Sequence, residues 1–533
     1  MKNKFIYLIF IISSVLVLSP TLSQTTFSKV VNGVNGNEYG IELMLHNNKY
    51  YTISKGVIHD TVSHTSITPD FMLIFDSVLQ KENRYVFKNG FATKSKYLDK
   101  DTIYVFGIDR SKNPKEWNVY KFNLKGDSLD MLVYDEFDVE YMEAMEMGIK
   151  GDYLYLAGRT YTNTFRGAEE IRVLKMDKSG KVVKENRFYD FANPEHINVL
   201  RDMTQTADGN FVITNMYYGT GDSNDHIALC KFDENLDTIW TKDIHTTKRT
   251  YQHNNDPYIT ATPDSGVVVS TAIDIFDLIW NDPAYEYNMR YPLLFYKLDK
   301  EGNIMWTDTL HEYSDDGISY KYIKYVEKLY TAKNGDILVA GRTRDVVPGS
   351  SVIKAWLCRY SPDGKRKWHH TYIDSEYYAN KSFFYDIKEA ENGDIICVGG
   401  LYTDIGDDYN NDYTWLLRVD SNGCFTPDCI LADTVTEVIV TSLNDLDVPI
   451  DMPRRVNIYP NPTLDHINIS LPEGINWSKW SIYDIKGQKI RTGSIDDQLD
   501  FIISGFSNLQ SGVYYIMVKG VKGRIGIGKF VVK

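Results

Sequence analysis

After residue 18, the 533-residue sequence has no apolar run long enough to cross a lipid bilayer. It also lacks a His-Glu-x-x-His motif, a Gly-x-Ser-x-Gly motif, a phosphate-binding glycine loop and a haem motif. Long stretches of helical periodicity are missing, and its apolar runs are short and rich in β-branched and aromatic residues. The sequence therefore predicts an all-β protein, with no catalytic residues and no cofactor that a motif identifies.

Cysteine is scarce, with five residues. Cys230, Cys358 and Cys397 lie in apolar, strand-like runs, which predicts buried thiols. Cys424 and Cys429 flank the turn-like segment "FTPD", and in an exported protein that spacing predicts a small disulfide ring. The pair lacks the second Cys/His pair that a zinc site needs.

Basic charge is also in deficit, because 58 Lys and Arg face 72 Asp and Glu. The last 78 residues are net basic, so the acidic excess lies in the body of the chain. An acidic body argues against nucleic acid or an anionic membrane as the main partner.

The N-terminus has the three parts of a secretory signal peptide: Lys2 and Lys4, an apolar run from Phe5 to Leu18, and a small polar region. We expect residues 1–23 to be removed after Ser23, which leaves no transmembrane span. An uncleaved anchor is the alternative. No cysteine lies directly after the apolar run, where a lipid would be attached, which argues against a lipoprotein anchor.

Two short patterns repeat along residues 24–430. The first is a glycine turn, four apolar residues and a small residue, as in "NGDILVAGRT" (Asn334–Thr343). Its small position recurs seven times, at Ser54, Gly107, Gly158, Asn215, Thr271, Gly341 and Gly399. The second reads apolar, Lys or Arg, apolar, Asp, two residues, Gly, as in "YKLDKEGNIMW" (Tyr296–Trp306). Asp and Gly suit tight turns, so each repeat contains two hairpins and four strands.

Seven four-stranded repeats predict a seven-bladed β-propeller over residues 24–430. The seventh repeat has no good fourth strand, so we expect "TTFSKVV" (Thr25–Val31) to supply it and close the ring. We expect Trp240, Trp306 and Trp368 to pack between blades. A solenoid or an array of β-sandwiches remains the alternative.

Residues 431–455 read as an acidic linker with one short strand at "TEVIV", and residues 456–533 as a small antiparallel, Ig-like β-sandwich. In "HINISL", Ile467, Ile469 and Leu471 alternate with polar residues. In "GVYYIMVKG", Tyr514, Ile516 and Val518 share one face.

This tail resembles the C-terminal type A sorting domain of type IX secretion system cargo. The resemblance rests on "YPNP", "YDIKGQKI", "LQSGVYYIMV" and "KFVVK", which include Tyr459, Pro460, Asn461, Pro462, Gly487, Gly512, Tyr514 and Lys529. It implies partnership with the secretion and sorting machinery, transit through the periplasm, removal of the tail near the linker, and release or attachment at the cell surface. The glycine-rich "KGRIGIGKFVVK" departs mildly from the family pattern.

We expect the propeller to act as a module that binds a glycan or a protein, because no acid/base or nucleophile motif recurs. A glycan hydrolase or lyase with acids around the central channel is the alternative, and a purely structural role is a third option. The long loops of a propeller share one face, and exposed loops on a rigid scaffold often carry recognition. We expect the binding face to include Tyr217, Tyr218, Trp280, Tyr285, Tyr287, Tyr402 and Tyr409. A Ca²⁺ site near "TDIGDDYNNDY" (Thr403–Tyr413) is possible, although its spacing does not match an EF-hand loop.

Overall fold

The computed structural model divides into two units, Met1–Asn444 and Asp445–Lys533, which are described separately. It describes residues 26–31, 37–60, 65–67, 70–77, 79, 81–87, 91–109, 111–112, 116–135, 141–161, 169–188, 197–218, 226–245, 257–272, 293–310, 322–345, 352–374, 381–403, 411–425, 436–440, 442–444, 454–471, 477–484, 489–495, 499–506, 509–520 and 525–533. Within these residues, no helix is long and apolar enough to span a membrane. The predicted signal peptide lies outside these ranges and stays a prediction.

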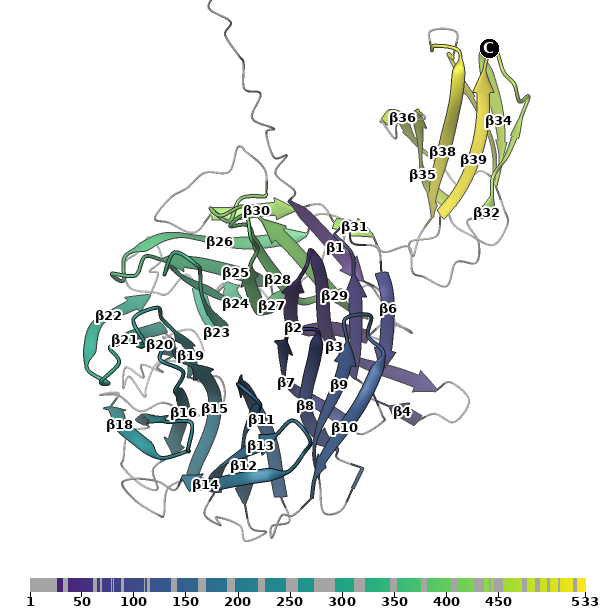
Figure 1. Cartoon of the computed structure of the whole chain (residues 1–533). Helices are drawn as coiled ribbons and strands as arrows, with labels where there is room; N and C mark the ends of the chain where they lie inside the picture. The colour runs from purple at the N-terminus through teal and green to yellow at the C-terminus, as the bar shows by residue number, and fades with distance from the viewer. Residues whose placement is uncertain are drawn as a thin grey trace, which may run out of the picture. The chain divides into compact units, whose positions relative to one another are not determined.

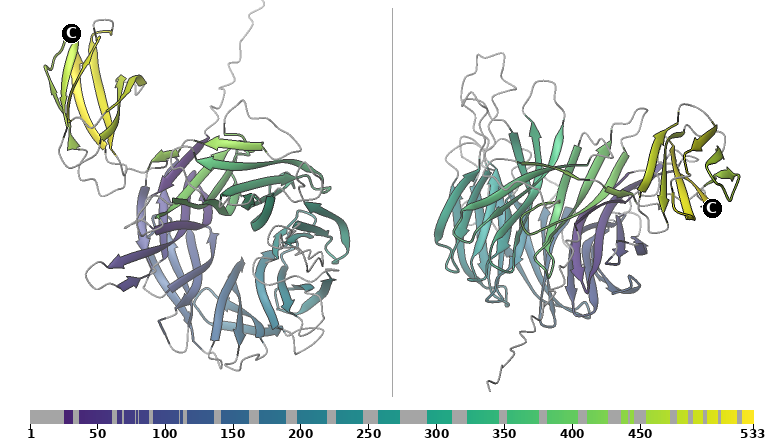
Figure 2. Two further views of the ribbon diagram at one scale, coloured as in Figure 1. Left: turned by 180° about the vertical axis from the view of Figure 1, so that it is seen from behind. Right: turned by 90° about the horizontal axis from the view of Figure 1, so that it is seen from above.

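The first unit is a ring of seven antiparallel blades, with the first strand of each blade innermost (Figure 1; Figure 2, left). Blade one contains β2 (Asn37–His46), β3 (Lys49–Asp60), β5 (Asp70–Phe75) and β6 (Lys81–Val86). Blade two contains β7 (Phe91–Asp99), β8 (Thr102–Asp109), β9 (Glu116–Asn123) and β10 (Ser128–Tyr134). Blade three contains β11 (Tyr141–Lys150), β12 (Tyr153–Tyr161), β13 (Glu169–Asp177) and β14 (Val182–Phe188). A short strand, β4 (Thr65–Ile67), pairs with the end of β3.

Blades four to seven continue round the ring. Blade four contains β15 (Ile197–Gln205), β16 (Phe211–Tyr218), β17 (His226–Phe232) and β18 (Thr238–His245), and blade five contains β19 (Tyr258–Ala261), β20 (Val267–Ala272), β21 (Leu293–Leu298) and β22 (Ile304–Leu310). Blade six contains β23 (Tyr322–Thr331), β24 (Ile337–Asp345), β25 (Ile353–Tyr360) and β26 (Arg366–Asp374). Blade seven contains β27 (Lys381–Glu389), β28 (Ile395–Thr403), β29 (Asn411–Val419) and β1 (Phe27–Val31). The seven-bladed propeller predicted from the repeats is confirmed.

Both ends of the propeller unit close the ring. β1 pairs antiparallel with β29, from Phe27 opposite Arg418 to Val31 opposite Thr414, so the expected N-terminal strand completes blade seven. The segment after blade seven forms two further strands: β30 (Thr436–Val440) pairs with β26, and β31 (Ser442–Asn444) pairs with β1. The structure therefore extends the propeller unit to Asn444, into the stretch that the sequence analysis assigned to a linker.

The residues of the repeated Asp-x-x-Gly pattern stabilise its turns and make contacts between neighbouring blades. In the Asp-x-x-Gly turn of blade five, Asp299 Oδ1 accepts the backbone N–H groups of Glu301 and Asn303 at 3.0 and 2.8 Å. Gly302 has a φ of +85°, which favours glycine. The ring of Trp240 in blade four lies against this glycine, and its indole N–H donates to the Lys300 carbonyl at 2.9 Å. Trp306 contacts the Pro362 carbonyl of blade six in the same way, at 3.0 Å. The tryptophans therefore pack between blades, as expected.

Apolar side chains fill the spaces between neighbouring blades. Cys230, Cys358 and Cys397 are buried free thiols, as predicted. Cys424 is buried, but Cys429 lies outside the described residues, so their disulfide stays a prediction.

The second unit is a two-sheet sandwich. One sheet has the order β32-β39-β38-β35-β36 and the other β33-β34-β37. The bounds are β32 (Arg454–Arg455), β33 (Asn457–Tyr459), β34 (His466–Ser470), β35 (Trp477–Asp484), β36 (Lys489–Ser494), β37 (Asp500–Ser504), β38 (Gly512–Gly520) and β39 (Ile525–Val532). The predicted core residues of β34 and β38, from Ile467 to Val518, are buried in one cluster between the sheets.

Candidate functional site

A belt of polar side chains lies on the innermost strands of the propeller. It takes one residue from the corresponding position of each blade, and we call these residues the axial belt: Glu42, Ser95, Glu146, Asp202, Tyr258, Lys328 and Asp386. In six blades a β-bulge directly precedes this position, opposite the small residue of strand two. Bulges re-aim the following side chain and often occur beside functional sites.

The belt joins neighbouring blades through the backbone. Asp386 of blade seven accepts the N–H of Leu43 in blade one at 2.8 Å. Asp202 accepts the N–H of Ile259 in the next blade at 3.1 Å, and Ser95 accepts that of Met147 at 3.2 Å. Such hydrogen bonds from buried groups fix the spacing of the innermost strands.

Ion pairs also join blades that are not adjacent in the chain. Lys96 of blade two contacts Asp386 of blade seven at 2.9 Å and also Glu42 of blade one. Lys328 of blade six lies 3.8 Å from Asp202 of blade four. Lysine and carboxylate side chains from blades that are separated by one intervening blade therefore meet at the level of the belt.

Burial shifts the proton affinities in this belt. It raises the pKa of Glu146 to about 7, against the opposing effect of Lys328 and with a further rise from Asp202. Burial also raises the pKa of Asp202 and lowers the pKa of Lys96 to about 7. Burial opposes ionisation of Asp386 too, but Lys388 and Lys96 hold the pKa of that carboxyl below its usual range. Glu146 is therefore a belt acid that can change protonation near neutral pH.

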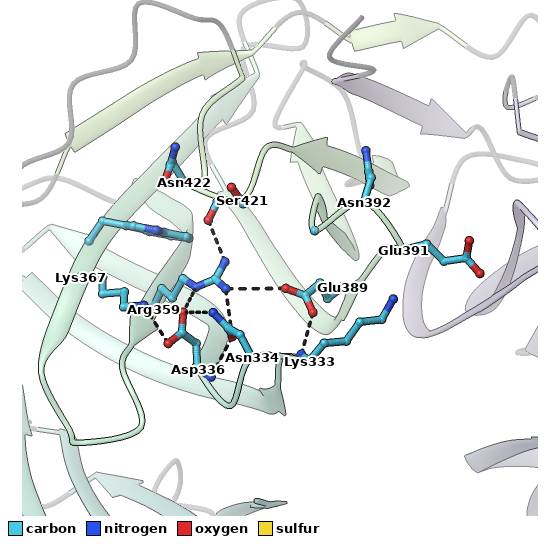
Figure 3. A pocket seen from close by; sticks show the side chains of 12 residues that line it. Lys333, Asn334, Asp336, Arg359, Lys367, Glu389, Glu391, Asn392, Ser421 and Asn422 are labelled. Carbon is cyan, nitrogen blue, oxygen red and sulfur yellow. Dashed lines mark hydrogen bonds and ion pairs between the residues drawn. The ribbon is translucent and has the colours of Figure 1, made fainter. Parts of the chain in front are cut away.

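A pocket of ≈ 580 Å³ lies between the turns of blades six and seven, on the face of the short turns (Figure 3). The Arg359 guanidinium lies at its centre, with Nε 2.6 Å from Asp336 Oδ2 and Nη1 2.8 Å from the Ser421 carbonyl. Lys367 Nζ lies 2.7 Å from Asp336 Oδ2, and Glu389 Oε1 lies 3.6 Å from Arg359 Nη2. We call this site the inter-blade pocket.

The charges of the pocket hold one another in place. Asp336 is 2 % and Arg359 7 % exposed, whereas Lys367 is 44 % exposed. Although burial opposes ionisation of Asp336, hydrogen bonds from Lys367, Asn334 and Arg359 keep its pKa below the ordinary value. The pocket thus offers fixed charged groups deep inside and a lysine that solvent reaches.

Aromatic residues gather at the opposite end of blades six, seven and one, where the strands enter the long loops. We call the group of Tyr39, Phe383, Tyr385, Tyr402 and Arg342 the mouth cluster. The Tyr39 and Tyr385 rings are 5.6 Å apart, and the Phe383 and Tyr402 rings 4.8 Å apart. The Arg342 guanidinium lies 5.9 Å from the centre of the Phe383 ring. Phe383 is buried, and the other four side chains are half-buried.

One residue of the predicted binding face can be placed in full: Tyr402 belongs to the mouth cluster. Tyr217 and Tyr218 end β16, but the orientation of their side chains is not described. Trp280, Tyr285, Tyr287 and Tyr409 lie outside the described residues, as does most of the segment considered for Ca²⁺. No group of three potential metal-ligating side chains meets within the ranges given above.

Sequence reasoning missed the belt and the inter-blade pocket. A signal for the belt was present, because each belt residue precedes the strand-one turn by the same number of residues. The belt partners come from different repeats, however, so their ion pairs could not be read from spacing. For the pocket, the signal was a pair of charged residues, Glu389 in blade seven and Lys367 in blade six. In each case, the corresponding positions of the two blades before it are uncharged.

In the second unit, the two ends of the predicted sorting motif meet. Asn461 donates through Nδ2 to the Lys529 carbonyl at 2.9 Å and accepts the N–H of Val531 at 3.0 Å. Tyr459 is exposed, Tyr514 is buried in the sandwich core, and Gly512 begins β38. Gly487 lies outside the described residues.

Residues 457–533 match the family described as "Secretion system C-terminal sorting domain". No curated protein matches the chain. The protein, a propeller followed by this sorting domain, is a cargo of the type IX secretion system. It is exported to the medium or the cell surface. The sorting domain implies interaction with the secretion machinery.

Several solved structures are similar at low identity. A protein of unknown function from Bacteroides caccae is 11 % identical, with 63 % of this chain and 94 % of that chain covered and a TM-score of 0.33. An acylaminoacyl peptidase is 9 % identical over 83 % and 59 %, with a TM-score of 0.38. A Penicillium chrysogenum α-L-arabinanase complexed with arabinobiose is 11 % identical over 62 % and 94 %, with a TM-score of 0.36. At these values the activities of the neighbours carry no argument about this chain.

Proposed function

We propose that the propeller is an extracellular recognition module that binds a glycan or a protein on its long-loop face. The mouth cluster is the observation that carries this proposal. Half-buried tyrosines supply a large contact area at low conformational cost, and their hydroxyl groups can hydrogen-bond a ligand. The ring holds these side chains on strands rather than on loops alone, which pre-organises a binding surface.

A binding experiment on the exported protein tests this proposal. Glycan arrays and extracellular-matrix proteins are probed with the wild type, with Tyr385→Ala and with a Tyr218→Ala/Tyr285→Ala/Tyr409→Ala variant. We expect the tyrosine variants to lose binding by about tenfold or more while their melting temperatures stay close to that of the wild type. Normal binding by both variants, or their unfolding, would contradict the proposal.

One observation favours a second candidate, a glycan hydrolase or lyase. Glu146, with its pKa of about 7, shares the belt with Asp386, whose pKa Lys388 and Lys96 hold below the usual range although burial opposes its ionisation. A protonated and an ionised carboxyl group are what general acid and base catalysis requires. Release of new reducing ends from a glycan, abolished in Glu146→Gln, would favour the enzyme over the recognition module.

A further inference from the structure

The inter-blade pocket contains one ion pair that also occurs in blades four and five, and two charged residues, Lys367 and Glu389, that have no counterpart there. In blades four and five, the basic residue of strand three pairs with the aspartate of the strand-one turn: Lys231 with Asp208 at 2.7 Å, and Lys297 with Asp264 at 2.9 Å. Arg359 and Asp336 form the same pair in blade six. That ion pair is a repeated structural feature of the propeller and explains neither Lys367 nor Glu389.

Lys367 departs from the repeat. The corresponding residues of blades five and four are Met305 and Ile239, both exposed and apolar. Lys367 instead directs its ammonium group to Asp336 while 44 % of its side chain stays accessible to solvent. Because an exposed apolar residue serves blades four and five at this position, the fold does not require a lysine.

Glu389 departs as well. The corresponding residues are Thr331 in blade six and Ala261 in blade five. Glu389 is 5 % exposed and accepts the backbone N–H of Lys333 at 2.8 Å, which holds its carboxylate against Arg359 across the blade boundary. Figure 3 shows Lys367 and Glu389 on opposite sides of the guanidinium.

The space beside Lys367 and Glu389 differs in size and character from the corresponding one between blades five and six. The corresponding pocket between blades five and six measures ≈ 280 Å³ and is lined in part by Pro263, Ile337 and Pro362. The inter-blade pocket measures ≈ 580 Å³, within the usual range for small-ligand sites. Its charged lining residues balance one another in sign: Lys333, Arg359, Lys367, Asp336, Glu389 and Glu391.

This balance limits the chemistry of a ligand. A charged ligand deep in the pocket would compete with the ion pairs around Asp336, and a buried charge that loses its partner is costly. A hydroxyl group both donates and accepts, so it can add hydrogen bonds to Lys367 and Glu391 while those pairs stay intact. Polyhydroxylated, uncharged molecules meet this requirement.

We propose that the inter-blade pocket is a second ligand site, on the opposite face of the ring from the mouth cluster, and that it binds a neutral saccharide. The site is separate from the one in the proposed function. It gives the exported protein two binding faces, so that one molecule can contact a saccharide and a second ligand together.

The test is calorimetric titration of the full secreted chain with the neutral disaccharides cellobiose, maltose, mannobiose and xylobiose, and with glucosamine and glucuronate as charged comparators. The diagnostic variant is Lys367→Met, which installs the residue of blade five and leaves the Arg359–Asp336 pair in place. We expect one or more of the disaccharides to bind, and Lys367→Met to bind it at least about tenfold more weakly. The matched control, Met305→Lys, changes the corresponding position of blade five and is expected to bind like the wild type.

Failure of all four disaccharides to bind would overturn the proposal, as would tighter binding of glucosamine or glucuronate, or wild-type affinity in Lys367→Met. Tyr385→Ala separates the two sites. If this variant loses disaccharide binding while Lys367→Met keeps it, the saccharide binds at the mouth cluster, which supports the proposed function and overturns the second site.

Discussion

Glu146 links the geometry of the belt to the pH dependence of stability. Its pKa is raised from 4.5 to about 7 in the folded protein, so folding favours the protonated form. The stability that this preference contributes is fully present below pH 4.5 and is lost as the pH rises to about 7. The groups that set the balance are Lys328, Asp202, Ser95 and Lys96.

Glu146→Gln should therefore raise the melting temperature more at pH 8 than at pH 5. Glutamine keeps the shape of the side chain and can accept the Ser95 hydrogen bond, which is 2.8 Å long in the wild type, without carrying a charge. Glu234→Gln is the matched control, because Glu234 is an exposed carboxylate whose pKa is lowered by its hydrogen bond with Lys150. An equal change in melting temperature at both pH values in Glu146→Gln would show that burial does not raise the pKa of Glu146.

At the scale of elements, β30 and β31 cover the outer edges of blades six and seven. Five residues of β30 pair with β26 and three of β31 pair with β1. Open outer strands expose unsatisfied backbone groups and are sites of unwanted pairing.

A propeller ending at Asn444 should consequently be more stable than one ending at Ile430. With each hydrogen bond contributing about 0.5–1.5 kcal/mol, the shorter chain is expected to lose about 3 kcal/mol or more. Denaturant titration of both truncations measures the difference, and both lack the sorting domain, so that domain does not enter the comparison. Equal midpoints would mean that β30 and β31 contribute nothing to the ring.

Local turn chemistry made most elements predictable from sequence. Asp299 and Gly302 bond within their own turn, and all seven small positions, from Ser54 to Gly399, lie on the second strands of their blades. β30 is the short strand that the sequence predicts at "TEVIV", but its pairing with β26 was not predicted, because the side chains of this segment could serve a linker as well as an edge strand. The pairing of Lys328 with Asp202 could not be predicted, because it depends on how the blades are arranged around the axis.

At the scale of the whole molecule, the propeller and the sorting domain have separate cores and separate sheets. Deleting Val456–Lys533 should therefore leave the propeller folded but keep it in the periplasm, because the segment that the sorting machinery binds is gone. Cell fractionation locates the truncated chain, and circular dichroism with thermal melting reports its fold. An unfolded product would place essential propeller contacts beyond Arg455, and efficient release to the medium would remove the sorting role of the tail.

The position of β1 in blade seven has a consequence for the order of folding. Its partner β29 begins at Asn411, so the ring closes through a contact between opposite ends of the propeller sequence. Bringing such distant segments together costs on the order of 5 kcal/mol in chain entropy. When the chain is synthesised from its N-terminus, β1 lacks β29 until the residues of blade seven have been made. The propeller therefore acquires its final topology late, after the blades between β2 and β26 are available as an open arc.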